Sequence, residues 1–357
     1  MNSAATPVPS HDISTKIPLY EASTQFKHWR HSPEGLSRVR QSQNEVAVAA
    51  IRNNLEANEP GSSADVAFLT ADEEVLLVRL YIAKITPLCA NFRFPEEVEA
   101  TAMTYLKRFY LKNTVMDWHP KNVMLTAVFL AAKTTNNLIS LEVYAKGIPG
   151  TMPHNVLDLE FLVAQSLGFE FAVWHAHRAL WGIWLDLQNL PGGTLDSAAY
   201  DAAMSEIRAS RLTDVELIYT PSQIALACLS LVSPALSQQW AASKLTPNGS
   251  ETSLSLAAVQ GVIGDIQKII KANGAPPSVE AVRDVDRRLR LCQNPEKIVG
   301  SKLYLAKQAE AERKAEEKRN KKAESVRKTM EGDPFGSTLP PSKPGLVDYD
   351  DDDDDED

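Results

Sequence analysis

Residues 104–133 read TYLKRFYLKNTVMDWHPKNVMLTAVFLAAK and predict a buried helix at the centre of a domain. His119 is able to cap this helix, and Pro120 fits its first position, where the missing N–H costs nothing. The residues that follow, KNVMLTAVFLAAK, are apolar nearly all round. Because a helix that is apolar on every side has to be enclosed by others, we expect its neighbours to surround it.

The second half of the chain repeats this pattern. TPSQIALACLSL, from Thr220, mirrors HPKNVMLTAVFL, from His119, with a capping residue, a proline, two polar residues and an apolar helix. Pro120 and Pro221 lie 101 positions apart, which is too long for a solenoid repeat. The spacing therefore indicates two tandem five-helix domains. No run alternates with period two long enough to demand a sheet, so the predicted fold class is all-α.

Flanking segments complete the predicted organisation. We expect an N-terminal extension with one helix over 1–64, beginning at Ser32 and ending near Leu55. The first domain is predicted over 65–172 and the second over 173–292. Within them, Thr70 opens a capping box, Pro95 and the stretches 141–146 and 155–167 mark further helices, and 238–255 is expected to be a loop. A basic helix over 293–330 and a disordered acidic tail over 331–357 follow.

The net charge is confined to the end of the chain. The total is −9, and residues 348–357 hold nine acidic side chains and no base, so residues 1–347 sum to −9 + 9 = 0. A neutral body lacks the electrostatic footprint of a nucleic-acid-binding protein. The three widely spaced cysteines indicate a reducing compartment. With no secretory signal visible and no apolar run longer than 123–132, we expect a soluble intracellular protein without a membrane partner.

Catalytic motifs are absent from the sequence. It contains no GxxxxGK[ST], GxGxxG, GxSxG or HExxH, so we expect no enzyme activity, no cofactor and no metal. His175 and His177 are two residues apart and would face different directions on a helix. We interpret them as linker residues packing on Trp181 and Trp184, and we interpret these tryptophans as a core stripe rather than a base-stacking platform.

The basic stretch 313–328 leaves two interpretations open. It contains KRNKK at 318–322, which suits nucleic acid or a nuclear address, and it equally suits a solvated helix face. The acidic tail offers a screen for these cations within the same chain.

Residues 104–133 also resemble a cyclin box, and cyclins carry two five-helix boxes in tandem. Within that family the resemblance is to the cyclin H group. It rests on four segments in order along residues 25–296: KHWR at 27–30, YLKRFYLKNTVMDWHP at 105–120, YTPSQIALA at 219–227 and SVEAVRDVDRRLRLCQNPE at 278–296.

The resemblance implies site residues. Lys133 matches the cyclin-box lysine and Glu160 matches the box glutamate, a pair that in the family hydrogen-bonds backbone near the αC helix of a kinase. Leu130, Thr134 and Ala164 are expected to line the apolar part of this contact. The text after the lysine, Thr134 to Asn137, lacks the acidic residues that many cyclins have there.

The resemblance also implies a function and partners. It implies a regulatory, non-catalytic subunit of a cyclin-dependent kinase, nuclear, with an assembly-factor third subunit and the TFIIH core as further partners. The expected roles are phosphorylation of the RNA polymerase II C-terminal domain, transcription initiation, DNA repair and activation of cell-cycle kinases. A DNA-binding factor of the TFIIB type and a helical scaffold without a kinase are the alternatives.

Overall fold

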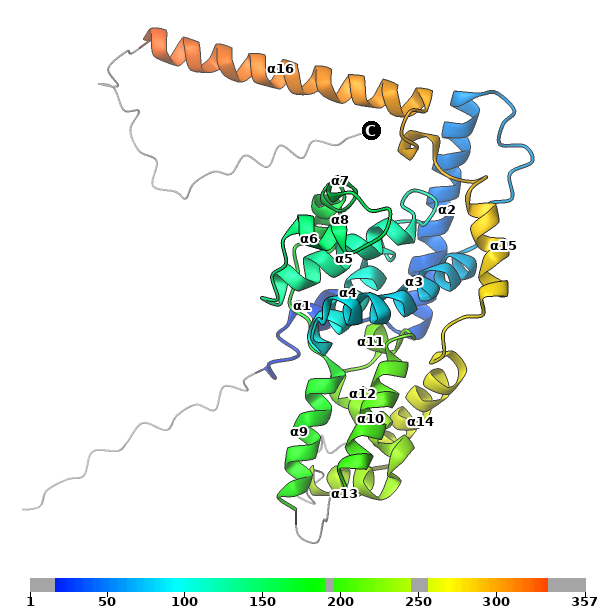
Figure 1. Cartoon of the computed structure of the whole chain (residues 1–357), viewed down its shortest axis with the longest axis vertical. Helices are drawn as coiled ribbons and strands as arrows, with labels where there is room; N and C mark the ends of the chain where they lie inside the picture. The colour runs from blue at the N-terminus through cyan, green and yellow to red at the C-terminus, as the bar shows by residue number, and fades with distance from the viewer. Residues whose placement is uncertain (1–16, 191–195, 245–255, 333–357) are drawn as a thin grey trace, which may run out of the picture. The chain divides into compact units, whose positions relative to one another are not determined.

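The computed structural model describes residues 17–190, 196–244 and 256–332, and within these ranges every regular element is a helix (Figure 1). The all-α fold class is therefore confirmed. The chain divides into two units, residues 1–297 and 298–357. The first unit holds both helical domains and the N-terminal helices, and the second holds one long helix.

The first domain is built around helix α5, Pro120–Thr134. Eleven of its 15 residues are buried, and His119 caps it by accepting from the amide of Lys121, as the sequence predicts. Around it lie α3 (Ala71–Phe92), α4 (Glu96–Phe109), α6 (Leu141–Lys146), α7 (Pro153–Leu157) and α8 (Glu160–Ser166). Their apolar side chains form one continuous core.

Helix α3 begins with the predicted capping box, in which Thr70 and Glu73 exchange hydrogen bonds. Among the described helices, it is long and apolar enough to cross a membrane. Its apolar side chains are used within the fold instead: Leu77, Ile82 and Ile85 are at most 1% exposed. The helix therefore serves as a wall of the core.

The single helix expected over 155–167 is wrong, because this stretch forms two short helices, α7 and α8. The carbonyl of Val156 accepts a hydrogen bond from the hydroxyl of Thr126 in α5, 3.1 Å away. This contact ties α7 to the central helix. The break at Asp158 and Leu159 gives Glu160 a helix N-terminus of its own.

The second domain repeats the arrangement around α12, Pro221–Val232, which opens with a capping box between Thr220 and Gln223. Its core is separate from that of the first domain. The surrounding helices are α9 (Ala176–Gln188), α10 (Ser197–Ser210), α11 (Val215–Ile218), α13 (Pro234–Lys244) and α14 (Leu256–Asn273). The loop expected over 238–255 is helical up to Lys244, and its remainder lies outside the described residues.

The N-terminal segment joins the two domains. The predicted helix after Ser32 is present as α2, Pro33–Asn58, and a short helix, α1, Thr24–His28, precedes it. Between them, Trp29 is 4% exposed and packs in a small cluster with Leu111 of the first domain and Leu217 of the second. The backbone amide of His31 donates to the carbonyl of Leu217 at 2.7 Å.

Helix α15, Val279–Leu289, returns to the first domain, where Val282, Val285 and Leu289 join its core. The basic helix predicted over 293–330 does not start at residue 293. Residues Pro295–Lys297 form a 3₁₀ turn, η1, and Gly300 has a φ of 90°, which is incompatible with a helix.

Helix α16, Lys302–Gly332, forms the second unit, and its described side chains from Leu305 to residue 327 are exposed. The predicted acidic tail lies outside the described residues, apart from residues 331 and 332, which end this helix.

Candidate functional site

Two charged residues predicted to act together are brought together by the fold. Lys133 lies in the last turn of α5, and Glu160 is the first residue of α8. The Lys133 ammonium and the Glu160 carboxylate form an ion pair across 27 positions of sequence. Each charge also suits its helix end, since cations are favoured at C-termini and anions at N-termini. The lysine side chain is 44% exposed and the glutamate 17%, so the pair faces solvent.

The three companion residues lie beneath this pair rather than around it. Leu130 is 5% exposed and Ala164 8%, and both belong to the core of the first domain. The hydroxyl of Thr134 lies 3.0 Å from the carbonyl of Leu130 and 3.0 Å from the hydroxyl of Tyr105. Leu130 and Ala164 are therefore largely buried within the first domain, and their place in the apolar part of a kinase contact stays a prediction.

Exposed aromatic side chains occupy that place instead. Phe161, beside Glu160, is 69% exposed, and Phe169, just past the end of α8, is 55% exposed. Their ring centroids are 6.1 Å apart. We call Phe161 and Phe169 the exposed aromatic pair. Sequence reasoning missed this pair, although the phenylalanines of EFLVAQSLGFEF at 160–171 were a visible signal.

The interpretation of the two histidines as partners of Trp181 and Trp184 is wrong. His175 precedes α9 with an extended backbone, so helical spacing does not separate it from His177, and the two rings stack at 5.2 Å. The Nε2 atom of His175 lies 2.9 Å from the Thr101 hydroxyl. Among the described residues, no group of three His, Cys, Asp or Glu side chains is placed to hold a metal ion.

Of the tryptophans expected in a core stripe, one is buried and one is not. Trp184 is 5% exposed and belongs to the core of the second domain. Trp181 is 50% exposed and packs edge-on against Tyr200. The core-stripe interpretation is thus confirmed for Trp184 and wrong for Trp181.

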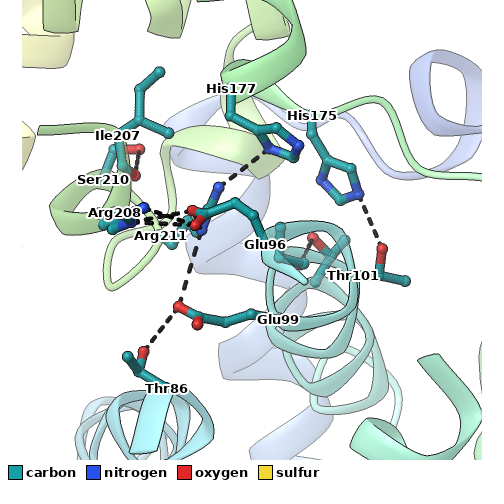
Figure 2. A network of polar contacts seen from close by, with 12 residues as sticks. Thr86, Glu96, Glu99, Thr101, His175, His177, Ile207, Arg208, Ser210 and Arg211 are labelled. Atoms are coloured by element: carbon teal, nitrogen blue, oxygen red, sulfur yellow. Dashed lines mark hydrogen bonds and ion pairs between the residues drawn. The ribbon is translucent and has the colours of Figure 1, made fainter. Parts of the chain in front are cut away.

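A polar network joins α4 of the first domain to α10 of the second (Figure 2). The Glu96 carboxylate accepts hydrogen bonds from the guanidinium groups of Arg208 and Arg211. Burial alone would raise the pKa of Glu96, but these two cations lower it to about 2. Arg211 also lies 3.1 Å from Nδ1 of His177. The network fixes the two domains against each other and was not predicted from the sequence.

Two family models match the chain in the order that the repeat predicts. The cyclin N-terminal domain matches residues 64–172, and the cyclin C-terminal domain matches residues 175–271. Together they include every site residue discussed above.

Whole-chain comparisons agree with these domains. The cyclin mcs2 of Schizosaccharomyces pombe is 30% identical over 88% of this chain and 98% of that protein. Cyclin-H1-1 of Arabidopsis thaliana is 30% identical over 76% of this chain and 88% of that protein.

Solved structures with the same fold come from the CAK and TFIIK complexes. A chain in the CAK complex from Chaetomium thermophilum, bound to ATP-gamma-S, is 28% identical and superposes with a TM-score of 0.72, covering 82% of this chain and 94% of that one. A chain of the yeast TFIIK complex of Kin28, Ccl1 and Tfb3 is 30% identical with a TM-score of 0.58, covering 70% of this chain and all of that one. The chain belongs to the cyclin family, in the group that contains cyclin H and mcs2.

Proposed function

We propose that this chain is the regulatory subunit of a cyclin-dependent kinase, which it binds and activates without supplying a catalytic group. Family membership and the likeness to a chain of the CAK complex support this proposal. The observation that carries it is the solvent-facing Lys133–Glu160 ion pair, whose Glu160 is followed directly by Phe161 of the exposed aromatic pair.

The proposed mechanism is a shift in the kinase's conformational population. A subunit that binds only one arrangement of the kinase favours that arrangement by its differential affinity. Lys133 and Glu160 would hydrogen-bond backbone groups of the kinase's αC region, and charge-assisted bonds are roughly twice as strong as neutral ones. Phe161 would add buried apolar area. Holding αC brings its glutamate to the β3 lysine, the contact that active kinases require.

Finer assignments follow from the named complexes. The TFIIK complex contains Kin28, Ccl1 and Tfb3, which supports a kinase and a third subunit as partners here. We extend the proposal to the TFIIH core, to a nuclear location, and to the transcription and repair roles given above. The TFIIB-type alternative is not favoured, because the relatives described are cyclins and the sequence outside the acidic tail is neutral.

A charge reversal separates a partner-binding role from a structural one. We compare Lys133→Glu, Glu160→Lys and the double reversal in tagged chains recovered from their own cells. Each eluate is assayed for kinase on a polymerase repeat peptide. The single variants break the ion pair, whereas the double reversal restores it with opposite polarity. If the partner reads the polarity, all three variants lose activity by about tenfold or more.

The control is the exposed ion pair of Lys268 and Asp265 on α14, reversed in the same way. This control should keep both kinase recovery and kinase activity. Full activity in the double reversal would mean that the Lys133–Glu160 pair acts within the chain alone, and absence of a kinase from the wild-type eluate would overturn the proposed function.

A further inference from the structure

The C-terminal half of helix α16 carries an unneutralised basic face. Residues 318–327 contain five cations and one carboxylate. Lys318, Lys321 and Lys322 are spaced three and four apart, which places them on one side of a helix, and Arg319 is adjacent. We call these four residues the basic face. All four side chains are exposed.

The first part of the same helix is different because its charges are internally paired. Lys314 lies 3.1 Å from the carboxylate of Glu310, and Arg313 lies 3.8 Å from that of Glu317. The four cations of the basic face have no carboxylate within ion-pair distance among the described side chains. The helix thus has a neutralised beginning and a face of free cations near its end.

The sequence supplies a complementary segment. Residues 348–357 hold nine acidic side chains and no base, whereas residues 1–347 sum to zero. Since the Debye length is about 10 Å at 0.1 M salt, such a segment is attracted strongly only to cations that it can approach closely. The basic face is the dense, unpaired cation cluster that lies nearest in sequence.

The length of the intervening chain fits a contact between the two. Helix α16 ends at Gly332, and residues 333–347 separate it from the acidic segment. At 1.5 Å per residue, the basic face lies about 15–21 Å back along the helix from that end. A Gly-rich linker of 15 residues would span about 19–23 Å, and the four prolines of residues 333–347 raise this toward the limit of about 46 Å for a fully extended polyproline chain, so the linker is long enough to reach the basic face. Effective concentration is highest when span and linker length match.

We propose that the basic face of α16 is a docking surface whose occupant is the chain's own acidic segment, residues 348–357. A tethered partner reaches millimolar effective concentration, so the segment weakens the binding of a free polyanion by the ratio of that concentration to its own dissociation constant for the basic face. The acidic segment therefore keeps the basic face from binding nucleic acid.

The first test measures access to the basic face. A fluorescein-labelled 20-nucleotide oligo-dT is titrated with the full chain and with a chain ending at Val347, at 50 and 300 mM salt. We expect the shortened chain to bind at least tenfold more tightly at 50 mM. The difference in oligonucleotide affinity between the two chains should be smaller at 300 mM salt. Each contacted phosphate adds about −0.7 to the slope of log affinity against log salt concentration.

Two matched variants of the shortened chain locate the effect. Lys321→Glu with Lys322→Glu should remove the gain in oligonucleotide affinity. Arg313→Glu with Lys314→Glu reverses the same number of charges on the same helix, but these cations are already paired, so most of the gain should remain. Far-UV circular dichroism checks that the helix persists in both.

The second test detects the contact directly in the full chain. Carbodiimide cross-linking at 50 mM salt should join Lys318, Lys321 or Lys322 to residues 348–357 within a monomer. A change of less than twofold on shortening the chain would overturn the proposal, as would cross-links that lie mainly on other lysines or between two chains. Equal oligonucleotide binding by the full and shortened chains would identify the basic face as a nucleic-acid surface that the tail leaves free.

Discussion

Arg211, which follows α10 in the second domain, donates to Glu96 at the start of α4 in the first, with Nη1 and Oε1 2.5 Å apart. The Arg211 side chain is 6% exposed, so its charge is largely removed from water. A buried cation needs its counter-ion, because removing one partner leaves the other uncompensated. The Glu96–Arg211 ion pair is therefore a specific contact that joins the two domains.

Replacing Glu96 with Gln should destabilise the chain by about 2 kcal/mol at pH 7 in urea unfolding. Glutamine keeps one acceptor but loses the charge that Arg208 and Arg211 share. The neighbouring change Glu97→Gln is the control. Its partner Arg178 is 66% exposed, and surface pairs contribute about 0–1 kcal/mol. Equal losses of unfolding free energy in the two variants would contradict a domain-joining role for Glu96.

The Glu96 carboxylate also makes the unfolding free energy depend on pH in the acid range. The pKa of Glu96 is lowered to about 2 in the folded chain from its ordinary 4.5. A depressed carboxyl pKa contributes stability that is complete above the ordinary value and is lost as the pH falls toward the folded one. The difference in unfolding free energy between wild type and Glu96→Gln should therefore shrink between about pH 4.5 and 2, as followed by urea midpoints.

His177 makes the unfolding free energy depend on pH in a second, less acidic range. Burial, and then the nearby charge of Arg211, lower its pKa to about 4 from 6.5. Between these values the unfolded chain binds more protons, so stability should fall as the pH is lowered from about 6.5 to 4. His177→Gln should flatten this slope by up to one proton, measured from urea midpoints between pH 7 and 5. The exposed His154→Gln control should retain the slope.

Trp29 should be the residue on which the N-terminal segment depends most. Its indole N–H donates to the Glu170 carboxylate at 2.5 Å, and the cations of Arg108 and Lys112 lie 4.9 and 4.8 Å from its ring. Trp29→Ala should cost about 3–5 kcal/mol, and Trp29→Phe, which keeps the apolar ring, about 1–3.

The half-exposed Trp181 is the matched control for Trp29. Trp181→Ala should lower the unfolding free energy clearly less than Trp29→Ala does. Urea unfolding gives the costs, and limited proteolysis near residue 20 reports release of the segment. Similar losses of unfolding free energy at Trp29 and Trp181 would argue against a special role of Trp29 in holding the N-terminal segment.

What could be predicted from the sequence was local. The capping residues His119 and Thr220, each followed by proline, marked both central helices, because a cap and an N1 proline act within one turn. The pairing of Lys133 with Glu160 is not local, and only the resemblance to cyclins indicated it.

What could not be predicted depends on tertiary contacts. The break before α8 has no signal in the sequence, and Phe161, the second residue of α8, is 69% exposed. The Glu96–Arg211 contact depends on how two domains meet, and no periodicity in either helix specifies that.

The last prediction concerns the exposed aromatic pair. Phe161→Ser removes a side chain that is 69% exposed, so the unfolding free energy should change by less than about 0.5 kcal/mol. If Phe161 is buried against the kinase, its truncation should weaken the complex by about tenfold or more, as aromatic hot spots do. Binding of the purified chain to its co-purified kinase, followed by surface plasmon resonance, measures this.

Val279→Ser on α15 is the matched control, because Val279 is 64% exposed and lies on a different helix from the Lys133–Glu160 pair. Loss of affinity in Phe161→Ser alone would place the kinase on α8, since general loss of surface apolarity would weaken both variants equally. Unchanged affinity in Phe161→Ser would restrict the contact to the ion pair, and the contact would then depend on salt far more steeply, because exposed charges are screened and buried apolar area is not.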